Sequence, residues 1–497
     1  MPQDSEHVRE RKAKREACLK QGMAPYGERF LPIESLQAVL DRFEEGRKVR
    51  IAGRLMARRS HGKSTFCDLK DETAKVQIYV KQETLGPEGY EQFSNLDLGD
   101  IVGLEGSLFL SKMGERTVKI EKFTLLSKIL QVLPEKWHGL KDVETRYRQR
   151  SVDLMVNDEV RQAFRRRSQI VRQIRQFLDE RGFLEVETPM MQPIPGGARA
   201  RPFVTHHEAL GMDLYLRVAP ELYLKRLLVG GMEKIYEINR NFRNEGLSVR
   251  HNPEFTMLEL YQAYADYTDM MNLTEELISG LAQSLHGAEE LVFGDRAVHF
   301  KRPWKRISFY EALREKTKVD WRRADIKKEA KKLGIEFAPA DEAIDVLNSV
   351  FGEVVEPDLW EPTFVIDYPA LLTPLAKPKE DDPELVYRFE LYIGKMEIAN
   401  AFSELNDPVI QRERLEKQVE IIGGTKKIDE DFLTALEFAM PPAGGLGIGI
   451  DRLVMILTNR SSIREVILFP QLRLSPHLNP PPASAGGGEE EGGVLLS

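Results

Sequence analysis

Cysteine is almost missing from this sequence: Cys18 and Cys67 are the only two among 497 residues. Two cysteines cannot build a disulfide framework or a four-cysteine zinc site, so small scaffolds of those classes are excluded. No apolar run reaches the roughly 18 residues of a membrane span, and no membrane partner is expected. Charged residues such as Glu6 and Arg9 stand where a secretory signal would be apolar. We therefore expect a cytoplasmic protein.

An excess of positive charge is missing too. Lysine and arginine number 71 against 79 aspartate and glutamate residues, which gives a formal net charge of −8. This balance excludes a uniformly basic nucleic-acid coat protein but leaves room for local basic patches. Hydrophobic residues make up 42% of the chain, as in globular proteins with a large core, and its length suggests about three domains.

The sequence pattern of the N-terminal third changes near residue 49, from a charged helical segment to short strands. Residues 1–48 form a charged helical extension, which fits a solvated surface and a nucleic-acid contact equally well. Residues 49–133 contain short strands between Gly- and Asp-rich turns, which predicts a small antiparallel β-barrel. Cations and an aromatic side chain on its first strands suit single-stranded bases, although composition alone favours an ordinary barrel with a solvated rim. These residues are Arg54, Arg58, Arg59, Lys63, Phe66 and Gln77.

The remaining two thirds mix helices and strands irregularly. Residues 134–156 are expected to be a linker, and residues 157–473 a second domain that begins with a helix ending at Gly182. Because the elements do not repeat as βαβ units, the fold class is α+β with a mainly antiparallel sheet flanked by helices. A helical insertion is expected around 291–359 and a disordered tail over 474–497, where glycine and glutamate dominate.

Three segments of this domain carry candidate chemistry. Residues 235–261 predict two strands joined by a polar loop, and a period of two places Phe255, Glu259 and Tyr261 on one face. Residues 389–404 predict a hairpin that turns near Gly394. Glu397 has the opposite parity from Asn400, Phe402 and Glu404, so a shared pocket requires a β-bulge.

The third segment is the glycine-rich stretch from Gly444 to Gly449, followed by Asp451, Arg452 and an apolar helix. A phosphate loop or Rossmann turn is a weak interpretation, because no Gly-Lys-Ser/Thr and no suitably placed acidic strand end follow. The glycines can instead let a strand and a helix pack closely, which leaves Arg452 at the helix start to face a ligand.

Together these segments resemble one family. Phe242-Arg243-Asn244-Glu245 and Gly447-Ile448-Gly449-Ile450-Asp451-Arg452 are similar to the second and third signature motifs of class II aminoacyl-tRNA synthetases, and the helix ending near Arg181 is similar to the first. Ala219-Pro220-Glu221-Leu222-Tyr223-Leu224-Lys225, Arg250-His251-Asn252-Pro253-Glu254-Phe255 and Phe402-Ser403-Glu404-Leu405-Asn406-Asp407-Pro408 narrow the resemblance to the bacterial type of class II lysyl-tRNA synthetases.

The resemblance implies a homodimer that uses ATP, L-lysine, tRNA(Lys) and Mg²⁺. It implies that Arg243 holds the α-phosphate of ATP, that Phe255 and Arg452 enclose adenine, and that Glu245, His251 and Asn252 line the ATP site. It implies Mg²⁺ on Glu390 and Glu397. It places the substrate's ε-ammonium among Glu221, Glu404 and Tyr261, with Gly197, Asn400 and Phe402 as further lysine-binding residues. Arg243, Glu245 and Arg452 are the implied catalytic residues.

The resemblance also assigns the barrel as an OB-fold that binds the anticodon through Arg59, Phe66 and Gln77. Two features depart from many relatives: Ala399 and Ala401 replace glycines, and Lys122 replaces an acidic residue. Alternative functions are a sister synthetase for aspartate or asparagine, a paralogue that lysylates a protein, a regulator without catalysis, and a plain RNA-binding protein. The aspartate or asparagine enzyme would need a cationic pocket where Glu221 and Glu404 stand.

Overall fold

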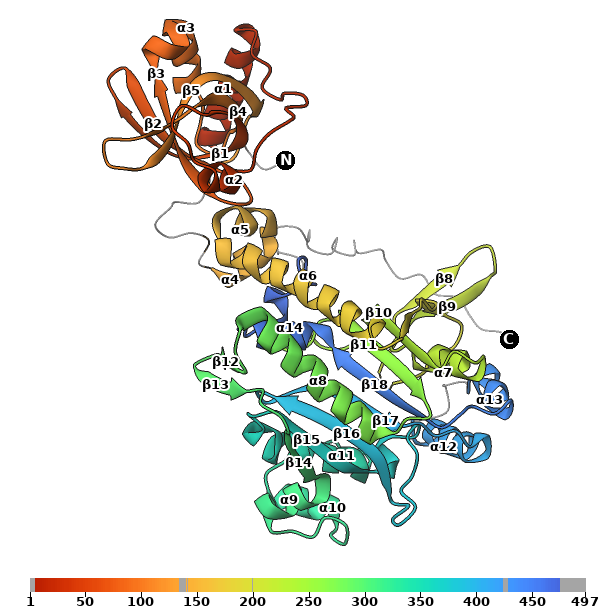
Figure 1. Cartoon of the computed structure of the whole chain (residues 1–497). Coiled ribbons are helices and arrows are strands. Elements are labelled where there is room, and N and C mark those ends of the chain that lie inside the picture. The colour runs from red at the N-terminus through yellow and green to blue at the C-terminus, as the bar shows by residue number, and fades with distance from the viewer. Residues whose placement is uncertain (1–4, 134–139, 141, 199, 423–427, 474–497) are drawn as a thin grey trace, which may run out of the picture. The chain divides into compact units, whose positions relative to one another are not determined.

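The computed structural model describes residues 5–133, 140, 142–198, 200–422 and 428–473 (Figure 1). The tail expected over 474–497 lies outside these residues. The chain divides into two compact units, Met1–Lys141 and Asp142–Ser497. No described helix is long and apolar enough to cross a membrane.

In the described part of the first unit, a closed five-stranded barrel is accompanied by three helices. Its strands run in the order β1-β2-β3-β5-β4. Their bounds are β1 (Lys48–His61), β2 (Ser64–Lys70), β3 (Lys75–Lys81), β4 (Ile101–Leu110) and β5 (Arg116–Ser127), and the helices are α1 (Glu6–Lys20), α2 (Leu36–Asp41) and α3 (Gln82–Ser94). The barrel is antiparallel, as predicted, except that β3 and β5 pair in parallel.

Alternation along the strands separates the barrel's core from its outer face. On β2 the side chains of Cys67 and Leu69 are buried, as is Ile78 on β3. Phe66 on β2 and Tyr79 on β3 are register partners on the opposite face. The period of two thus fills the barrel with aliphatic side chains and leaves aromatic ones outside it.

The second unit is built on an eight-stranded sheet in the order β14-β15-β16-β17-β18-β11-β10-β6. It is antiparallel except for the pairs β14/β15 and β10/β6, which are parallel. Its strands are β6 (Leu184–Glu185), β10 (Lys234–Phe242), β11 (Glu254–Ala263), β14 (Lys305–Ser308), β15 (Thr363–Pro369), β16 (Leu385–Ile393), β17 (Met396–Ser403) and β18 (Ala443–Gly449). Two small sheets contain β7 (Met191–Gln192), β8 (Val204–His207), β9 (Met212–Leu216), β12 (Glu290–Phe293) and β13 (Arg296–His299). The fold is α+β, as predicted.

Helices accompany this sheet. They are α4 (Val143–Arg148), α5 (Arg150–Val156), α6 (Asp158–Asp179), α7 (Glu221–Val229), α8 (Tyr267–His286), α9 (Phe309–Thr317), α10 (Ile326–Lys332), α11 (Ala343–Val354), α12 (Pro408–Ile422), α13 (Glu430–Glu437) and α14 (Ile450–Thr458), with 3-10 turns at Glu356–Asp358, Ala370–Leu372 and Ile463–Glu465. Most of the first part of the proposed linker, residues 134–141, lies outside the described residues, and its last part is helical, in α4 and α5. The span 291–359 contains most of the β12–β13 hairpin and β14 besides helices.

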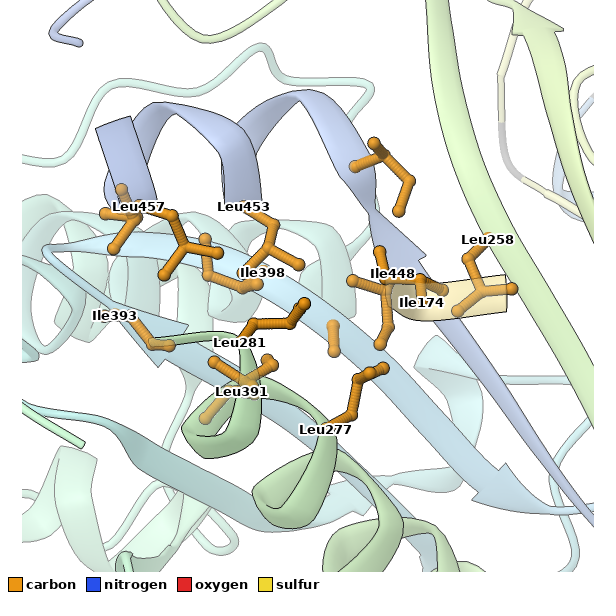
Figure 2. Close-up of a cluster of buried hydrophobic side chains, with 14 of the residues drawn as sticks. Ile174, Leu258, Leu277, Leu281, Leu391, Ile393, Ile398, Ile448, Leu453 and Leu457 are labelled. Carbon is orange, nitrogen blue, oxygen red and sulfur yellow. The ribbon is translucent and has the colours of Figure 1, made fainter. Parts of the chain in front are cut away.

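The main core lies where α6, α8 and α14 bury their apolar faces against the central sheet. Ile174 on α6 and Leu453 on α14 are fully buried, because their helices repeat apolar residues every three or four positions. Figure 2 shows Leu277 and Leu281 of α8 pointing toward the strands that carry Leu391 and Ile398. This rigid layer supports the strands that carry the polar residues described next.

Candidate functional site

A cavity of about 460 Å³ lies in the second unit and is lined by strands β11, β16, β17 and β18 and by the segments beside them. Its walls contain every residue predicted for the nucleotide, metal and amino-acid sites. These are Gly197, Glu221, Arg243, Glu245, His251, Asn252, Phe255, Tyr261, Glu390, Glu397, Asn400, Phe402, Glu404 and Arg452. Segments more than 200 residues apart therefore meet in one place.

Strand β11 forms part of the floor mainly through alternation, although Thr256 from the other face of the strand lines the cavity too. Phe255, Glu259 and Tyr261 line the cavity, whereas Leu258 and Leu260 are fully buried in the core. The face predicted from the period of two is therefore the face that the cavity uses. β18 runs beside this strand and pairs Gly445 with Tyr261.

The bulge predicted in the hairpin is present in β17. Leu391 pairs with Ala399, but the next residue, Tyr392, pairs with Glu397, so Ile398 is the extra residue on β17. The shift brings Glu397 to the cavity together with Asn400 and Phe402 despite its opposite parity.

One end of the cavity is rich in arginine. Arg243 lies with its guanidinium 5.1 Å from the centre of the Phe255 ring, and its buried Nε has no hydrogen-bond partner among the described residues. Burial lowers the pKa of Arg243, yet arginine remains protonated in proteins. A free donor on a buried guanidinium suits a phosphate oxygen.

Arg452 and His251 form the other part of this end. Arg452 donates to the backbone oxygen of Glu397 at 2.8 Å, and its Nη2 lies 3.0 Å from His251 Nε2. A guanidinium can only donate, so Nε2 must accept and Nδ1 must carry the proton, which it donates to Ser248 Oγ at 2.8 Å. Burial lowers the pKa of His251, and the charge of Arg452 lowers it further, which keeps the imidazole neutral.

Loop 244–253 is fixed by its own side chains. Asn252 donates to the backbone oxygen of Glu254 at 2.5 Å and accepts from the backbone of Gln471 at 3.3 Å. Its amide is thus used to shape the loop, although it lines the cavity. Glu245 is exposed. Arg250 forms an ion pair of 2.9 Å with Glu356, which was not predicted.

Two carboxylates stand beside the arginines. Glu390 accepts hydrogen bonds from the hydroxyls of Tyr368 and Tyr392, both at 2.7 Å, and from Arg388. Burial raises the pKa of Glu390 and repulsion from Glu397 adds to the effect, whereas Arg388 opposes it. Within the described residues, no group of three or more His, Cys, Asp or Glu side chains could hold a metal alone. The pair fits Mg²⁺ that takes its other ligands from phosphate oxygens and water.

The opposite end is acidic. Glu221 begins α7 and Glu404 directly follows β17, and both side chains are almost completely buried. Between them lies Lys225, whose Nζ is 2.7 Å from Glu221 Oε1 and also ion-paired with Glu404. Burial raises the pKa of Glu404 to about 8, although the charge of Lys225 lowers it. The protein therefore places an ammonium group of its own behind the two carboxylates of this end.

Glu259 lies between the two ends and received no role from the sequence. Its carboxylate accepts from the hydroxyl of Tyr261 at 3.3 Å. Burial, reinforced by repulsion from Glu221, raises the pKa of Glu259 to about 8, while Arg243 opposes the shift. It thus interacts electrostatically with both the acidic and the basic end.

Two glycines make the acidic end possible. Gly197 has φ +85°, and a Cβ there would lie 3.2 Å from the Cβ of Glu221. Gly445 has no side chain to displace the carboxylate of Glu404, which packs directly over it. The glycine-rich segment is therefore strand β18, and it makes room for site residues rather than binding phosphate as a loop.

Sequence reasoning missed Lys225, Arg388 and Glu356. Arg388 donates to Asn400 Oδ1 at 3.0 Å as well as to Glu390, so it orients two predicted residues. Glu221 and Lys225 have the spacing of an ordinary surface ion pair on a helix, which hid their burial. Alternation along β16 could have predicted Arg388, because residues 388 and 390 lie on the same face of the strand.

The residues predicted to bind an anticodon lie on neighbouring strands of the barrel. Arg59 on β1 is the register partner of Phe66 on β2, whose ring centre is 4.7 Å from that of Tyr79. Tyr79 in turn lies 5.8 Å from Phe109, so three aromatic rings cross this face. Gln77 donates to Glu115 at 2.6 Å and is largely buried. The face offers stacking surface beside a cation.

Comparison with known proteins bears on both units. A family model described as tRNA synthetases class II (D, K and N) matches residues 142–473. A second model, OB-fold nucleic acid binding domain, matches residues 49–126. The chain is 57% identical over 481 residues to a protein of Pelotomaculum thermopropionicum named lysine–tRNA ligase, covering 94% of this chain and 95% of that protein. Proteins with the same name from Carboxydothermus hydrogenoformans and Moorella thermoacetica are 55% and 54% identical, covering 94% and 91% of this chain and 98% and 94% of their own lengths.

Proposed function

Because the chain belongs to the class II tRNA synthetases of the D, K and N group, we propose that it is a lysine–tRNA ligase. It joins L-lysine to the AMP part of ATP, which forms lysyl-adenylate and releases pyrophosphate, and then transfers the lysyl group to the 3′ end of tRNA(Lys), which releases AMP. The observation that carries the choice of lysine is the pair of buried carboxylates, Glu221 and Glu404, at the cavity end opposite the arginines.

These carboxylates favour an amino acid with a terminal cation. Glu404 forms an ion pair with Lys225. Apart from this ion pair, neither oxygen of the Glu404 carboxylate accepts a hydrogen bond from a described residue. The ε-ammonium of lysine supplies donors for such oxygens. A neutral or anionic side chain would leave them unpaired, which buried polar groups penalise strongly. Glu259, between the two ends, is placed to accept from the α-ammonium.

The basic end fits the nucleotide. The α-carboxylate of lysine forms a bond to the α-phosphorus of ATP as the bond from that phosphorus to the pyrophosphate oxygen breaks. Arg243 neutralises charge on the α-phosphate, and Arg452 and Phe255 flank the adenine through cation–π contact and stacking. Glu245, His251 and Asn252 shape the rest of the nucleotide site. Positioning and electrostatic stabilisation are the enzyme's contributions, since no covalent nucleophile is needed.

Mg²⁺ is the proposed cofactor. Glu390 and Glu397 would hold it, because a divalent cation relieves the repulsion between two neighbouring carboxylates that face the phosphates. The ion would neutralise charge on the phosphate oxygens. Arg388 keeps Glu390 in place for this role through its hydrogen bond.

The remaining assignments complete this function. Residues 49–133 bind the anticodon through Arg59, Phe66 and Gln77, and residues 157–473 carry catalysis. The enzyme works in the cytoplasm as a homodimer. Exposed apolar side chains near the end of α6 support the dimer, because a partner would cover them; they are Leu184, Met190 and Met191.

A synthetase for aspartate or asparagine is the nearest rival, and it would need a cationic group free to meet the substrate. Lys225 is not such a group, because both of its carboxylate partners already neutralise it. A protein-lysylating paralogue would have little use for the aromatic face of the barrel.

Amino-acid-dependent ATP–pyrophosphate exchange tests the proposal. Each of the twenty amino acids is supplied separately with ATP, Mg²⁺ and labelled pyrophosphate, without tRNA. We expect exchange with lysine alone. Exchange with aspartate or asparagine instead of lysine contradicts the proposal, and so does a lack of exchange with all twenty amino acids.

A further inference from the structure

Lys225 is a buried charged group that the proposed mechanism leaves without a task. Its side chain is fully buried, and it is absent from the cavity wall, although both of its carboxylate partners line that wall. Its Nζ also lies 5.4 Å from the centre of the Phe402 ring. A lysine enclosed in this way is costly to desolvate, and its partners must compensate for that cost.

We propose that Lys225 is a positioning residue for substrate recognition: its ammonium holds Glu221 and Glu404 in place as a pair that, once both are ionised, presents one unbalanced negative charge to the cavity. The inference rests on the proposed function, since it explains how the lysine pocket is prepared. Two carboxylates contribute two negative charges and Lys225 returns one positive charge, so one further ammonium completes the balance. That ammonium is the terminal group of the substrate.

The Glu221 and Glu404 carboxylates have one side that faces Lys225 and another that faces the cavity-lining residues. Glu221 Oε1 and one oxygen of Glu404 face Lys225 from behind the wall. Glu404 Oε1 instead lies over Gly445 and next to the Tyr261 ring, and both of these residues line the cavity. The substrate and Lys225 therefore approach the carboxylates from different directions and do not compete for one position.

Without Lys225 the carboxylates would repel each other in a buried site. One of them would then keep a proton at neutral pH, as neighbouring buried carboxyls do. Burial already raises the pKa of Glu404 to about 8 while Lys225 is present. Lysine would have to displace this proton in order to bind, which weakens binding at neutral pH. At higher pH the proton is already lost, so binding is restored.

Other charged groups surround this cluster and must be kept unchanged in a test. They are Glu259 and Tyr261 on β11, Glu237 on β10 with its partner Arg217, and Asp429 at the start of α13 with its partner Arg226. Glu237 and Asp429 are already ion-paired, at 2.7 and 2.6 Å. Glu259 and Glu404 both have a pKa of about 8. The effect of Lys225 is therefore measured as the difference between the pH profiles of the wild type and the variant.

The barrel offers a matched control. Lys128 is also fully buried between two carboxylates, with Nζ 2.5 Å from Asp97 and 2.8 Å from Asp100, but it belongs to the other unit. Lys128→Met removes the same kind of buried ion pair. It should lower thermal stability and leave the KM for lysine in the exchange reaction unchanged.

The test is lysine- and ATP-dependent exchange with the full-length enzyme and Lys225→Met, from pH 6.5 to 8.5. At pH 7 the KM for lysine should rise about tenfold or more, the loss expected for weakening one charged contact, while the KM for ATP stays within about twofold. The rise of kcat/KM for lysine with pH should move to higher pH. An unchanged or lower KM for lysine, or equal changes in both KM values, overturns the inference.

A double variant keeps the test decisive if Lys225→Met fails to fold. Replacing both members of a buried pair by uncharged side chains is tolerated far better than removing one. Lys225→Met/Glu404→Gln should therefore fold and show a KM for lysine no higher than that of Glu404→Gln alone, because removing both charges leaves Glu221 as the one negative charge that the substrate's ammonium balances. A further rise of tenfold or more in the double variant contradicts this. Wild-type enzyme that fails to exchange with lysine would instead refute the proposed function.

Discussion

The Glu404 carboxylate fills the space that a side chain at Gly445 would need: a Cβ at Gly445 would lie 1.9 Å from Glu404 Oε1. The backbone of β18 and the carboxylate are therefore in direct contact, with the Tyr261 ring also 2.7 Å from that position. The absence of a side chain at Gly445 is what lets a carboxylate reach the acidic end of the cavity.

Gly445→Ala should displace the Glu404 carboxylate and raise the KM for lysine by about tenfold or more, the loss expected when a charged hydrogen bond is disturbed. The KM for ATP should change little, because the proposed nucleotide site is at the arginine-rich end. Exchange kinetics at varied lysine and varied ATP measure both. Gly280→Ala on α8 is the control, since nothing lies within 4 Å of a Cβ there. An unaltered KM for lysine in Gly445→Ala would contradict the placement of Glu404.

Glu404→Gln removes the charge and keeps the shape. The KM for lysine should rise about 10- to 100-fold, as expected for losing a hydrogen bond between charged groups. The same exchange assay with ATP varied should give a KM close to that of the wild type. Equal effects on the two KM values would show that Glu404 does not contact the amino acid.

Lysine binding should strengthen as pH rises through about 8. Burial raises the pKa of Glu404 and of Glu259 to about 8, so both carboxyls are protonated at lower pH and ionise above it. Since we propose that lysine binds the ionised forms, kcat/KM for lysine should increase from pH 6.5 to 8.5. In Glu404→Gln the rise should become shallower, because one of the two titrating groups is gone. A profile that falls over this range would contradict the assignment.

Phe66→Ala tests the barrel. The ring lies 4.7 Å from Tyr79 on the aromatic face, and stacking contributes about 1–3 kcal/mol per base. The KM for tRNA(Lys) in aminoacylation should therefore rise about tenfold or more, while lysine-dependent exchange is unchanged. Loss of exchange, or full retention of charging, would contradict an anticodon role for this face.

Local patterns were enough for much of the site. Alternation identified the cavity-facing side of β11, and the parity of Glu397 required the bulge that β17 contains. These features depend on neighbouring residues in the chain, so a period of two determines them. The parallel pairing of β3 with β5 joins distant strands, and no local pattern specifies it.

Lys225 could not be found in the same way. Its spacing from Glu221 matches the pairs that stabilise exposed helices, and only the packing of α7 shows that it is buried. The resemblance to a known family supplied the identities of the ligands, which residue chemistry left open. Burial and charge balance came from the structure.

A crystal structure with bound L-lysine would show whether the two buried carboxylates hold the terminal ammonium of the substrate. We expect the terminal nitrogen about 3 Å from carboxylate oxygens of both Glu221 and Glu404, with Lys225 still on their far side. A terminal nitrogen that contacts neither carboxylate, or a substrate that binds with its α-ammonium at this end, would contradict it.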